Sequence, residues 1–138
     1  MKKISIIQPD DWHVHFRDEE MLKLVVPETD KVFGKCIVMP NLVPPITNNS
    51  MAIEYQKRIK KHLKKVKTYL TIYLTEKTDA ENLVAAFKEK TVFAVKLYPL
   101  GATTNSNFGI KNLKNIMSVL ATMEKNDIPL LIHGEDTD

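Results

Sequence analysis

Short apolar segments alternate with amphipathic segments along the whole chain. The apolar segments are rich in β-branched and aromatic residues or alternate between polar and apolar side chains, which predicts strands. They are residues 4–7, 10–18, 35–39, 67–74, 91–97 and 129–133. The segments between the later strands repeat apolar residues at the spacing of helix turns, which predicts helices.

Four helices are expected, and local signals suggest where each begins and ends. The expected starts are Glu19 after an Asp18 cap, Asn49 or Ser50, a capping box at residues 78–81, and the segment around Leu113. The expected ends are Pro27, which should kink the first helix or end its regular part before Gly34, about Lys65 for the second, and Asn126 for the fourth.

This order of elements predicts an α/β fold with a parallel sheet built from βαβ units. The candidate reactive residues lie near or just after strand ends; they are His13, His15, Asn41, Lys96 and His133. Parallel strands bring their carboxyl ends to one side, so these side chains should converge as on the active face of a TIM-type (β/α)8 barrel. Such a barrel needs about 250 residues. Four βα units and a fifth strand therefore correspond to roughly its first half.

Composition and charge exclude several other classes of protein. The 138 residues are 43% hydrophobic and 27% charged with a net charge of +3, as in an ordinary soluble domain. The excess positive charge lies mostly in residues 57–67, on the outer face of a predicted helix, without interleaved aromatic residues. We therefore expect no nucleic-acid partner. The single cysteine, Cys36, and the absence of a signal peptide or membrane-length segment predict a cytoplasmic protein without membrane contact.

The segment from Asp10 to Asp18 carries the most distinctive chemistry. Side chains alternate along a strand, so His13, His15 and Arg17 should share one face. Two imidazoles so placed can bind one metal ion, and an arginine beside them can hold a carboxylate. Two histidines at this spacing are by themselves weak evidence, because they also occur by chance at polar strand ends.

Lys96 adds a second signal, because it lies between Val95 and Leu97 in an apolar strand. Lysine is rarely buried without a partner. Its amine could reach solvent from the strand end, form a Schiff base, or capture carbon dioxide as a carbamate that bridges two metal ions. The residues alone leave these three alternatives open.

Four segments in order resemble motifs of the shorter, bacterial-type dihydroorotases of the amidohydrolase superfamily. They are residues 9–18, 39–45, 96–99 together with 102–106, and 130–135. The resemblance runs over the whole chain with compatible spacing. It implies reversible cyclisation of N-carbamoyl-L-aspartate to L-dihydroorotate in pyrimidine biosynthesis.

The resemblance also implies a site with two zinc ions bridged by N6-carboxylated Lys96. His13 and His15 would bind the more buried zinc, and His133 would bind the second. Two metal ions with a bridging hydroxide supply a nucleophile near neutral pH and polarise a carbonyl.

Substrate-binding roles follow from the same resemblance. Arg17 and Asn41 would hold the substrate carboxylate, and Thr103 and Thr104 would close over the substrate from a mobile loop. The partner is thus a small molecule, and the family implies a homodimer.

Two family features have no match before Asp138, a further histidine ligand and the aspartate that acts as general acid/base. We therefore expect residues 1–138 to be the N-terminal portion of a single catalytic barrel domain, inactive by itself. Two alternatives remain. One is another binuclear cyclic amidohydrolase, similar to hydantoinases or allantoinases, and the other is a non-catalytic metal-binding assembly fragment.

Overall fold

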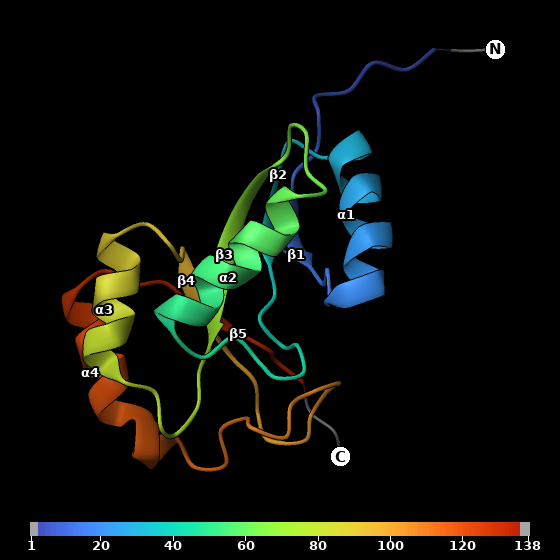
Figure 1. The fold of residues 1–138 in the computed structure, drawn as a ribbon. Coiled ribbons are helices and arrows are strands. Elements are labelled where there is room, and N and C mark those ends of the chain that lie inside the picture. Colours follow the sequence, from blue (N-terminus) through green and yellow to red (C-terminus); the bar gives the residue numbers. More distant parts are fainter. Residues whose placement is uncertain (1–2, 136–138) are drawn as a thin grey trace.

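A parallel sheet with helices along one face forms the protein (Figure 1), and the computed structural model describes residues 3–135. The elements in chain order are β1 (Asp11–Val14), α1 (Glu19–Val32), β2 (Lys35–Val38), α2 (Asn49–Lys60), β3 (Lys67–Tyr73), α3 (Ala80–Lys88), β4 (Ala94–Leu97), the 3-10 helix η1 (Leu113–Ile116), α4 (Met117–Lys125) and β5 (Leu130–Ile132). The predicted alternation of strands and helices is confirmed.

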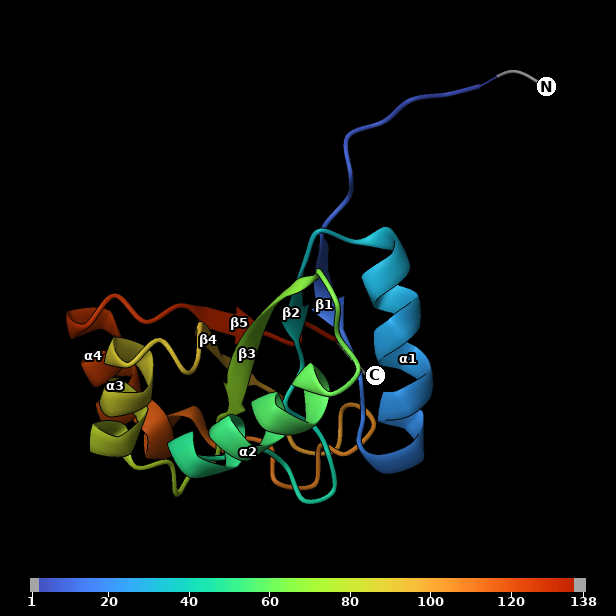
Figure 2. The same ribbon diagram turned by 45° about the horizontal axis from the view of Figure 1, so that its top comes forward.

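The five strands lie side by side in the order β1-β2-β3-β4-β5, and every neighbouring pair is parallel. The register is staggered, because residues 67–70 of β3 pair with β2, whereas Thr71, Ile72 and Tyr73 pair with β4. Such stagger is the shear that a closing barrel requires. The sheet with its outer layer of helices is therefore a half-barrel (Figure 2), as the sequence predicts.

The hydrophobic core lies between the sheet and the helices. Alternate strand residues such as Cys36, Leu70 and Val95 pack there against helix residues such as Val26 and Ile59. The burial of Cys36 raises the pKa of its thiol to about 12, in agreement with an unreactive structural cysteine. The strand residues between these core positions point to the opposite face of the sheet, where the candidate site lies.

The strand predictions fail at two places. Residues 4–7 form no strand and leave Ile4, Ile6 and Ile7 exposed by 86%, 78% and 93%. β-branched residues favour a strand only when a neighbour supplies the ladder, and none lies beside this segment. The fourth strand begins at Ala94 and not at Thr91, because Thr91 and Val92 donate their N–H groups to Ala86 at the end of α3.

The helix predictions hold at most starts and at the ends of the first and fourth helices, and they fail at the end of the second. Asp18 caps α1 as expected, and the helix continues through Pro27 to Val32. α2 ends at Lys60, five residues before the predicted end at Lys65, because Asp30 binds the backbone that follows.

The third helix has a different cap from the one predicted. The side chain of Asp79, not that of Thr78, accepts the N–H groups of Glu81 and Asn82. The Thr78 hydroxyl instead accepts from the N–H of Thr75. Among the described helices, none has both the length and the apolar character needed to cross a bilayer.

Candidate metal and substrate site

The carboxyl ends of the strands bring His13 and His15 into direct apposition. β1 ends at Val14, so His13 is in the strand and His15 follows it, and their Nε2 atoms lie 3.2 Å apart. Burial lowers the pKa of His13, helped by the Lys96 and His133 charges, and lowers that of His15 to about 4, helped by the Arg17 and His13 charges. Both rings are therefore neutral at pH 7, which is the form that binds metals.

Asn41, just after β2, connects this histidine pair to the rest of the site. It is 2% exposed, and its Oδ1 lies 2.9 Å from His15 Nδ1. Because an amide oxygen only accepts, His15 donates from Nδ1 and keeps the lone pair of Nε2, the atom that faces His13. The Asn41 Nδ2 donates to the carbonyl of Thr104 at 2.9 Å, so both ends of the side-chain amide have partners.

Arg17 reaches the same place by a different route from the one predicted. It does not continue a strand with His13 and His15, because its φ of 57° lies in the left-handed region. Tyr55 holds this turn by donating its hydroxyl to the Arg17 carbonyl at 2.7 Å. The guanidinium then donates to the Asn41 carbonyl at 3.1 Å, which leaves further donors for a ligand.

Lys96 is buried at the centre of the sheet, in β4. It is 2% exposed, and within residues 3–135 its amine forms no hydrogen bond or salt bridge. Burial lowers its pKa, and its Nζ lies 5.2 Å from the centre of the Tyr98 ring. This burial disfavours a charged ammonium group and favours an amine that is available for chemistry, while the three alternatives for that amine stay predictions.

Tyr98 gives the clearest indication of a ligand-binding site at this end of the sheet. It is 1% exposed, and its hydroxyl is buried without a hydrogen-bond partner among the described residues. Its ring lies 5.0 Å from that of Tyr73 and 5.9 Å from that of His133, between centroids. Burial raises the pKa of Tyr98, so the phenol keeps its proton as a donor. A buried hydroxyl without a partner costs free energy, which a bound group could recover.

His133 follows β5 and lies on the Tyr98 side of the site. Its Nε2 is bonded to the carboxylate of Glu135, the last described residue. The His133 ring packs near that of Tyr98, at a centroid separation of 5.9 Å. The structure thus brings His13 and His15 into contact, and it places Lys96 and His133 beside Tyr98.

The loop after β4 holds Thr103 and Thr104. Inside it, the Thr103 N–H donates to the Ser106 hydroxyl at 3.0 Å, and Ser106 is fully buried. Only the backbone of Thr104 touches Asn41, while the Asn105 side chain donates to the Asn41 carbonyl at 3.0 Å. The predicted role of Thr103 and Thr104 in covering the substrate stays a prediction.

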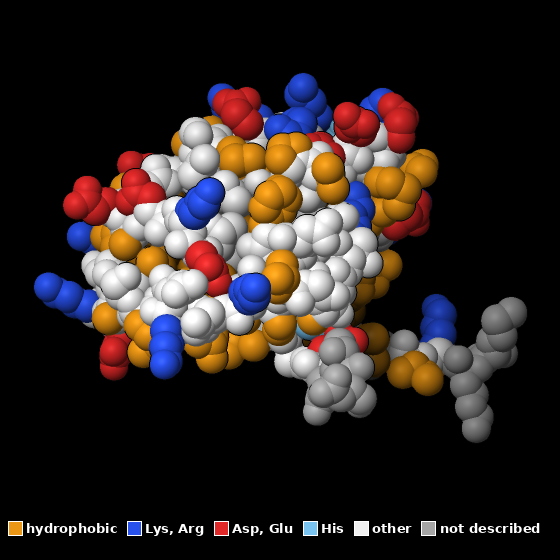
Figure 3. All heavy atoms as spheres, turned by 90° about the horizontal axis from the view of Figure 1, so that it is seen from below, with side chains coloured by type: hydrophobic (Ala, Val, Ile, Leu, Met, Phe, Trp, Pro, Cys, Tyr) orange, Lys and Arg blue, Asp and Glu red, His pale blue; other side chains and the backbone are white. Residues whose placement is uncertain are grey.

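The two stems of this loop are fixed to each other by backbone contacts. The Ile110 N–H donates to the Tyr98 carbonyl at 2.8 Å, and the Leu100 N–H donates to the Ile110 carbonyl at 3.1 Å. A Cβ on Gly109 would lie 2.6 Å from the Tyr98 carbonyl oxygen, so only glycine fits at this crossing. The loop thus begins and ends within a few ångströms of Tyr98. Figure 3 views this end of the molecule, where charged side chains gather mainly around the rim.

The donor set fits a metal site that needs additional ligands. Nowhere in residues 3–135 do three His, Cys, Asp or Glu side chains lie close enough to hold a metal ion. The two facing imidazole nitrogens fit two ligands of one ion, and the buried Lys96 amine lies 5.2 Å from the centre of the Tyr98 ring. The aspartate expected beyond Asp138 lies outside the described residues.

Comparison with known proteins agrees with this geometry. A dihydroorotase of Coxiella burnetii is 49% identical over 100% of this chain, which spans 40% of that relative's length. The crystal structure of dihydroorotase from Campylobacter jejuni matches with a TM-score of 0.86 and 37% identity over 95% of this chain and 39% of that one. This chain is similar over its whole length to part of the dihydroorotases.

Two further structures extend the comparison. Dihydroorotase from Saccharomyces cerevisiae, in complex with 5-fluoroorotic acid, matches with a TM-score of 0.85 and 29% identity over 94% of this chain and 38% of that one. An L-hydantoinase from Arthrobacter aurescens shares the fold, with a TM-score of 0.75 but 16% identity over 94% of this chain and 29% of its own. No protein-family model matches the chain. The predicted resemblance to dihydroorotases and the predicted fold class are confirmed.

Sequence reasoning missed two parts of the site. The motif at residues 96–99 contains Tyr98, for which the sequence alone predicts no role, although a tyrosine two residues after a buried lysine falls on the same face of a strand. The contacts of Asn105 and Ser106 could not have been found, because they depend on how the loop folds back on Asn41.

Proposed function

We propose that this chain forms the first part of a dihydroorotase, the enzyme that reversibly cyclises N-carbamoyl-L-aspartate to L-dihydroorotate. The observation that carries the proposal is the meeting of His13, His15, Asn41 and buried Lys96 at one end of the sheet, in a chain 49% identical to a dihydroorotase. The chain spans only 40% of that relative, so the activity belongs to the proposal and includes residues beyond those described. On this proposal, residues 1–138 are the N-terminal portion of a single catalytic barrel domain.

The histidines and Lys96 would hold the metal ions. His13 and His15 would bind one zinc through their facing Nε2 atoms, and His133 would bind a second zinc after releasing Glu135. The neutral Lys96 amine would add to carbon dioxide and lose a proton, which gives a carbamate whose oxygens can reach both ions. Bound zinc supplies Lewis-acid polarisation of a carbonyl and lowers the pKa of water.

The remaining residues would orient the substrate. The Arg17 guanidinium keeps donors free beside Asn41 and would bind the substrate carboxylate in a fork. Asn41 would set the tautomer of His15 and hold the loop in place, and its position beside the guanidinium would let it contact the same carboxylate. Thr103 and Thr104 would cover the substrate from the loop and exclude water. The bound 5-fluoroorotic acid of the yeast enzyme supports a ring with a carboxylate as the ligand class.

A substrate panel tests the proposal against its alternatives. Dihydroorotate, hydantoin and allantoin are offered to this chain and to a C-terminally extended form that carries the later strands, both with zinc and bicarbonate. We expect turnover of dihydroorotate only, and only by the extended form. Turnover of hydantoin or allantoin instead would favour a different cyclic amidohydrolase. Zinc binding without turnover in either form would favour a non-catalytic assembly fragment.

Arg17→Lys in the active form tests the carboxylate anchor. A point charge cannot replace a bidentate fork, so KM for dihydroorotate should rise by about tenfold or more while kcat changes less. Lys23→Arg, on the exposed face of α1, serves as the matched control and should leave KM unchanged. An unchanged KM in Arg17→Lys would remove Arg17 from the substrate site.

Three narrower proposals accompany this function. The chain would act in the cytoplasm, because it has a single cysteine and that cysteine is buried. It would bind a small molecule and not nucleic acid. It would assemble as a homodimer, a proposal that rests on the resemblance to dihydroorotases alone.

A further inference from the structure

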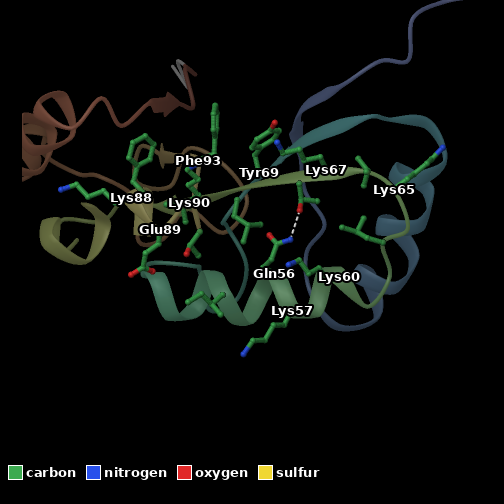
Figure 4. Close-up of a pocket in the computed structure, with 18 of the residues that line it drawn as sticks. Gln56, Lys57, Lys60, Lys65, Lys67, Tyr69, Lys88, Glu89, Lys90 and Phe93 are labelled. Carbon is green, nitrogen blue, oxygen red and sulfur yellow. Dashed lines mark hydrogen bonds between the residues drawn. The ribbon is translucent and has the colours of Figure 1, made fainter. Parts of the chain in front are cut away.

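A groove with seven lysines opens at the end of the sheet opposite the candidate site (Figure 4). It has a volume of about 1170 Å³ and lies between α2, the start of β3 and the turn after α3. β3 rises by about 3.3 Å per residue, so its first residue lies about 20 Å from its end near the site. None of the residues discussed for the metal or substrate lines this groove.

The lysines come from three separate segments of the chain. Lys57 and Lys60 belong to α2, Lys64, Lys65 and Lys67 to the link before β3 and its first residue, and Lys88 and Lys90 to the end of α3 and the turn after it. The one acidic lining residue is Glu89, and the Asn49 side chain donates to it at 2.9 Å. The lining therefore carries a formal charge of +6 from seven lysines and one glutamate, whereas the whole chain carries +3.

Most of these ammonium groups have no carboxylate partner. Lys57 pairs with Glu54 one turn away, and Lys67 lies 4.9 Å from the Tyr69 ring centre. Within residues 3–135, the other lining lysines form no salt bridge; they are Lys60, Lys64, Lys65, Lys88 and Lys90. Unpaired like charges around one groove repel one another, and an anionic ligand would relieve that repulsion.

The floor of the groove is apolar, and this narrows the ligand class. Val66, Leu70 and Val92 form its base, and Phe93 and Ile53 are each 38% exposed at its sides. The Phe93 ring lies 5.2 Å from that of Tyr69, and both rings stand on the side of β3 that faces away from α2 (Figure 4). A bare phosphate would leave the apolar floor exposed to water. A segment that alternates acidic and apolar side chains would cover the floor and contact the lysines at the same time.

A second copy of this chain does not suit the groove as occupant. A two-fold interface places the same patch on both subunits, so lysines would face lysines. We propose that the groove is a docking site for an acidic, partly apolar segment of a partner protein. Such a segment would lie along α2 and the start of β3, at the end of the sheet away from the candidate site.

A peptide titration tests this docking site. A fluorescent peptide of alternating glutamate and leucine is titrated into the protein, and the anisotropy is followed at low and high salt. We expect saturable binding that weakens with salt, because screening shortens the Debye length to about 10 Å at 0.1 M. Lys60→Glu with Lys88→Glu should weaken it by about tenfold or more, since each change removes an attraction and adds a repulsion.

Matched variants and competitors complete the test. Lys77→Glu with Lys114→Glu makes the same change in net charge on exposed lysines outside the groove and should leave the affinity unchanged. A photo-crosslinker on the peptide should label residues in 57–67 or 88–93, which holds even if a charge variant folds poorly. Absent binding, equal weakening by both pairs, labels elsewhere, or equal competition by an acid-only peptide, inorganic phosphate or duplex DNA would each overturn the proposal.

Discussion

Two buried ionisable side chains, Asp30 and Lys96, lie near opposite ends of the sheet and differ in their hydrogen-bond partners. Asp30 is 6% exposed and its Oδ1 accepts the N–H groups of Lys64, Lys65 and Val66 at 2.8 to 3.2 Å. Lys96 is 2% exposed and has no such partner among residues 3–135.

The difference separates a structural charge from a chemical one. Burial disfavours the charged form of Asp30, but the three backbone donors outweigh it and lower the pKa of the carboxyl. Lys96 has only the burial, which lowers the pKa of its amine and leaves a reactive group without compensation. A protein keeps an uncompensated buried amine where chemistry needs it, and the orphaned Tyr98 hydroxyl beside it fits the same explanation.

Removal of the Lys96 amine should have the largest effect on function. Lys96→Ala in the catalytically active form should lower turnover on the order of a thousandfold, because the proposed carbamate ligand of the metal ions would be lost. Added short carboxylic acids should restore part of the rate by occupying the vacated space. Zinc content and turnover are measured together, and a variant that keeps two zinc ions and the full rate would show that the carbamate proposal is wrong.

Asn41→Leu should have the largest effect on stability at the site end. The change leaves His15 Nδ1 and the Thr104 carbonyl without partners, so the free energy of unfolding should fall by about 2–4 kcal/mol. Asn107→Leu, at an exposed position of the loop after β4 that also holds Thr104, is the control and should shift it by less than about 0.5 kcal/mol. Denaturant unfolding measures both variants. Equal shifts would contradict a stabilising role for the contacts of Asn41 with His15 and Thr104.

Lys96→Met tests the difference between Lys96 and Asp30 through the free energy of unfolding. Methionine has a similar volume and no charge to bury, so the metal-free protein should become more stable by about 1–2 kcal/mol. The same replacement of a paired charge, Asp30→Leu, should instead destabilise it, since three N–H groups lose their acceptor. A loss of stability in Lys96→Met would mean that the amine has a structural partner after all.

Tyr98→Phe should have little effect on the fold and a measurable effect on function. The hydroxyl has no partner to lose, so the free energy of unfolding should stay the same or rise by up to about 1 kcal/mol. kcat/KM for dihydroorotate should fall by about tenfold if the hydroxyl donates to the bound group. Tyr73→Phe, which removes a hydrogen bond to the Asn105 carbonyl at 3.3 Å, is the matched variant. Full activity in Tyr98→Phe would leave the orphaned hydroxyl without a role.

The smallest expected effect is the pH dependence that Asp30 contributes. Its pKa is lower in the folded than in the unfolded protein, so its stabilisation is complete above the unfolded value, about 3.9. The stabilisation is lost as the pH falls through the folded value. Asp30→Asn should therefore flatten the fall in stability below about pH 4. Denaturant midpoints between pH 2 and 6 measure it, and parallel curves for the two proteins would contradict it.

Local sequence signals predicted the architecture well. Alternating apolar segments gave the order of strands, Asp18 capped the helix it was expected to cap, and Lys96 is buried as its apolar neighbours suggested. These features depend on residues close in sequence, whose preferences survive folding.

Features that depend on distant contacts could not be predicted. α2 stops at Lys60 because Asp30, at the end of α1, accepts the N–H groups of Lys64, Lys65 and Val66 and so holds that link out of the helix. The contacts of Asn41 likewise depend on the loop after β4, because its partner Thr104 is 63 residues away in sequence.

The glycine crossing beneath the loop after β4 has an evolutionary consequence. Because Gly109 lets the two stems touch at Tyr98, the two ends of the loop are held together independent of how many residues lie between them. Each doubling of such a loop adds only about 0.6 kcal/mol of closure entropy. The loop can thus change in length at small cost. Descendants of this scaffold could in this way acquire a preference for a different substrate ring while Lys96 and Tyr98 keep their positions.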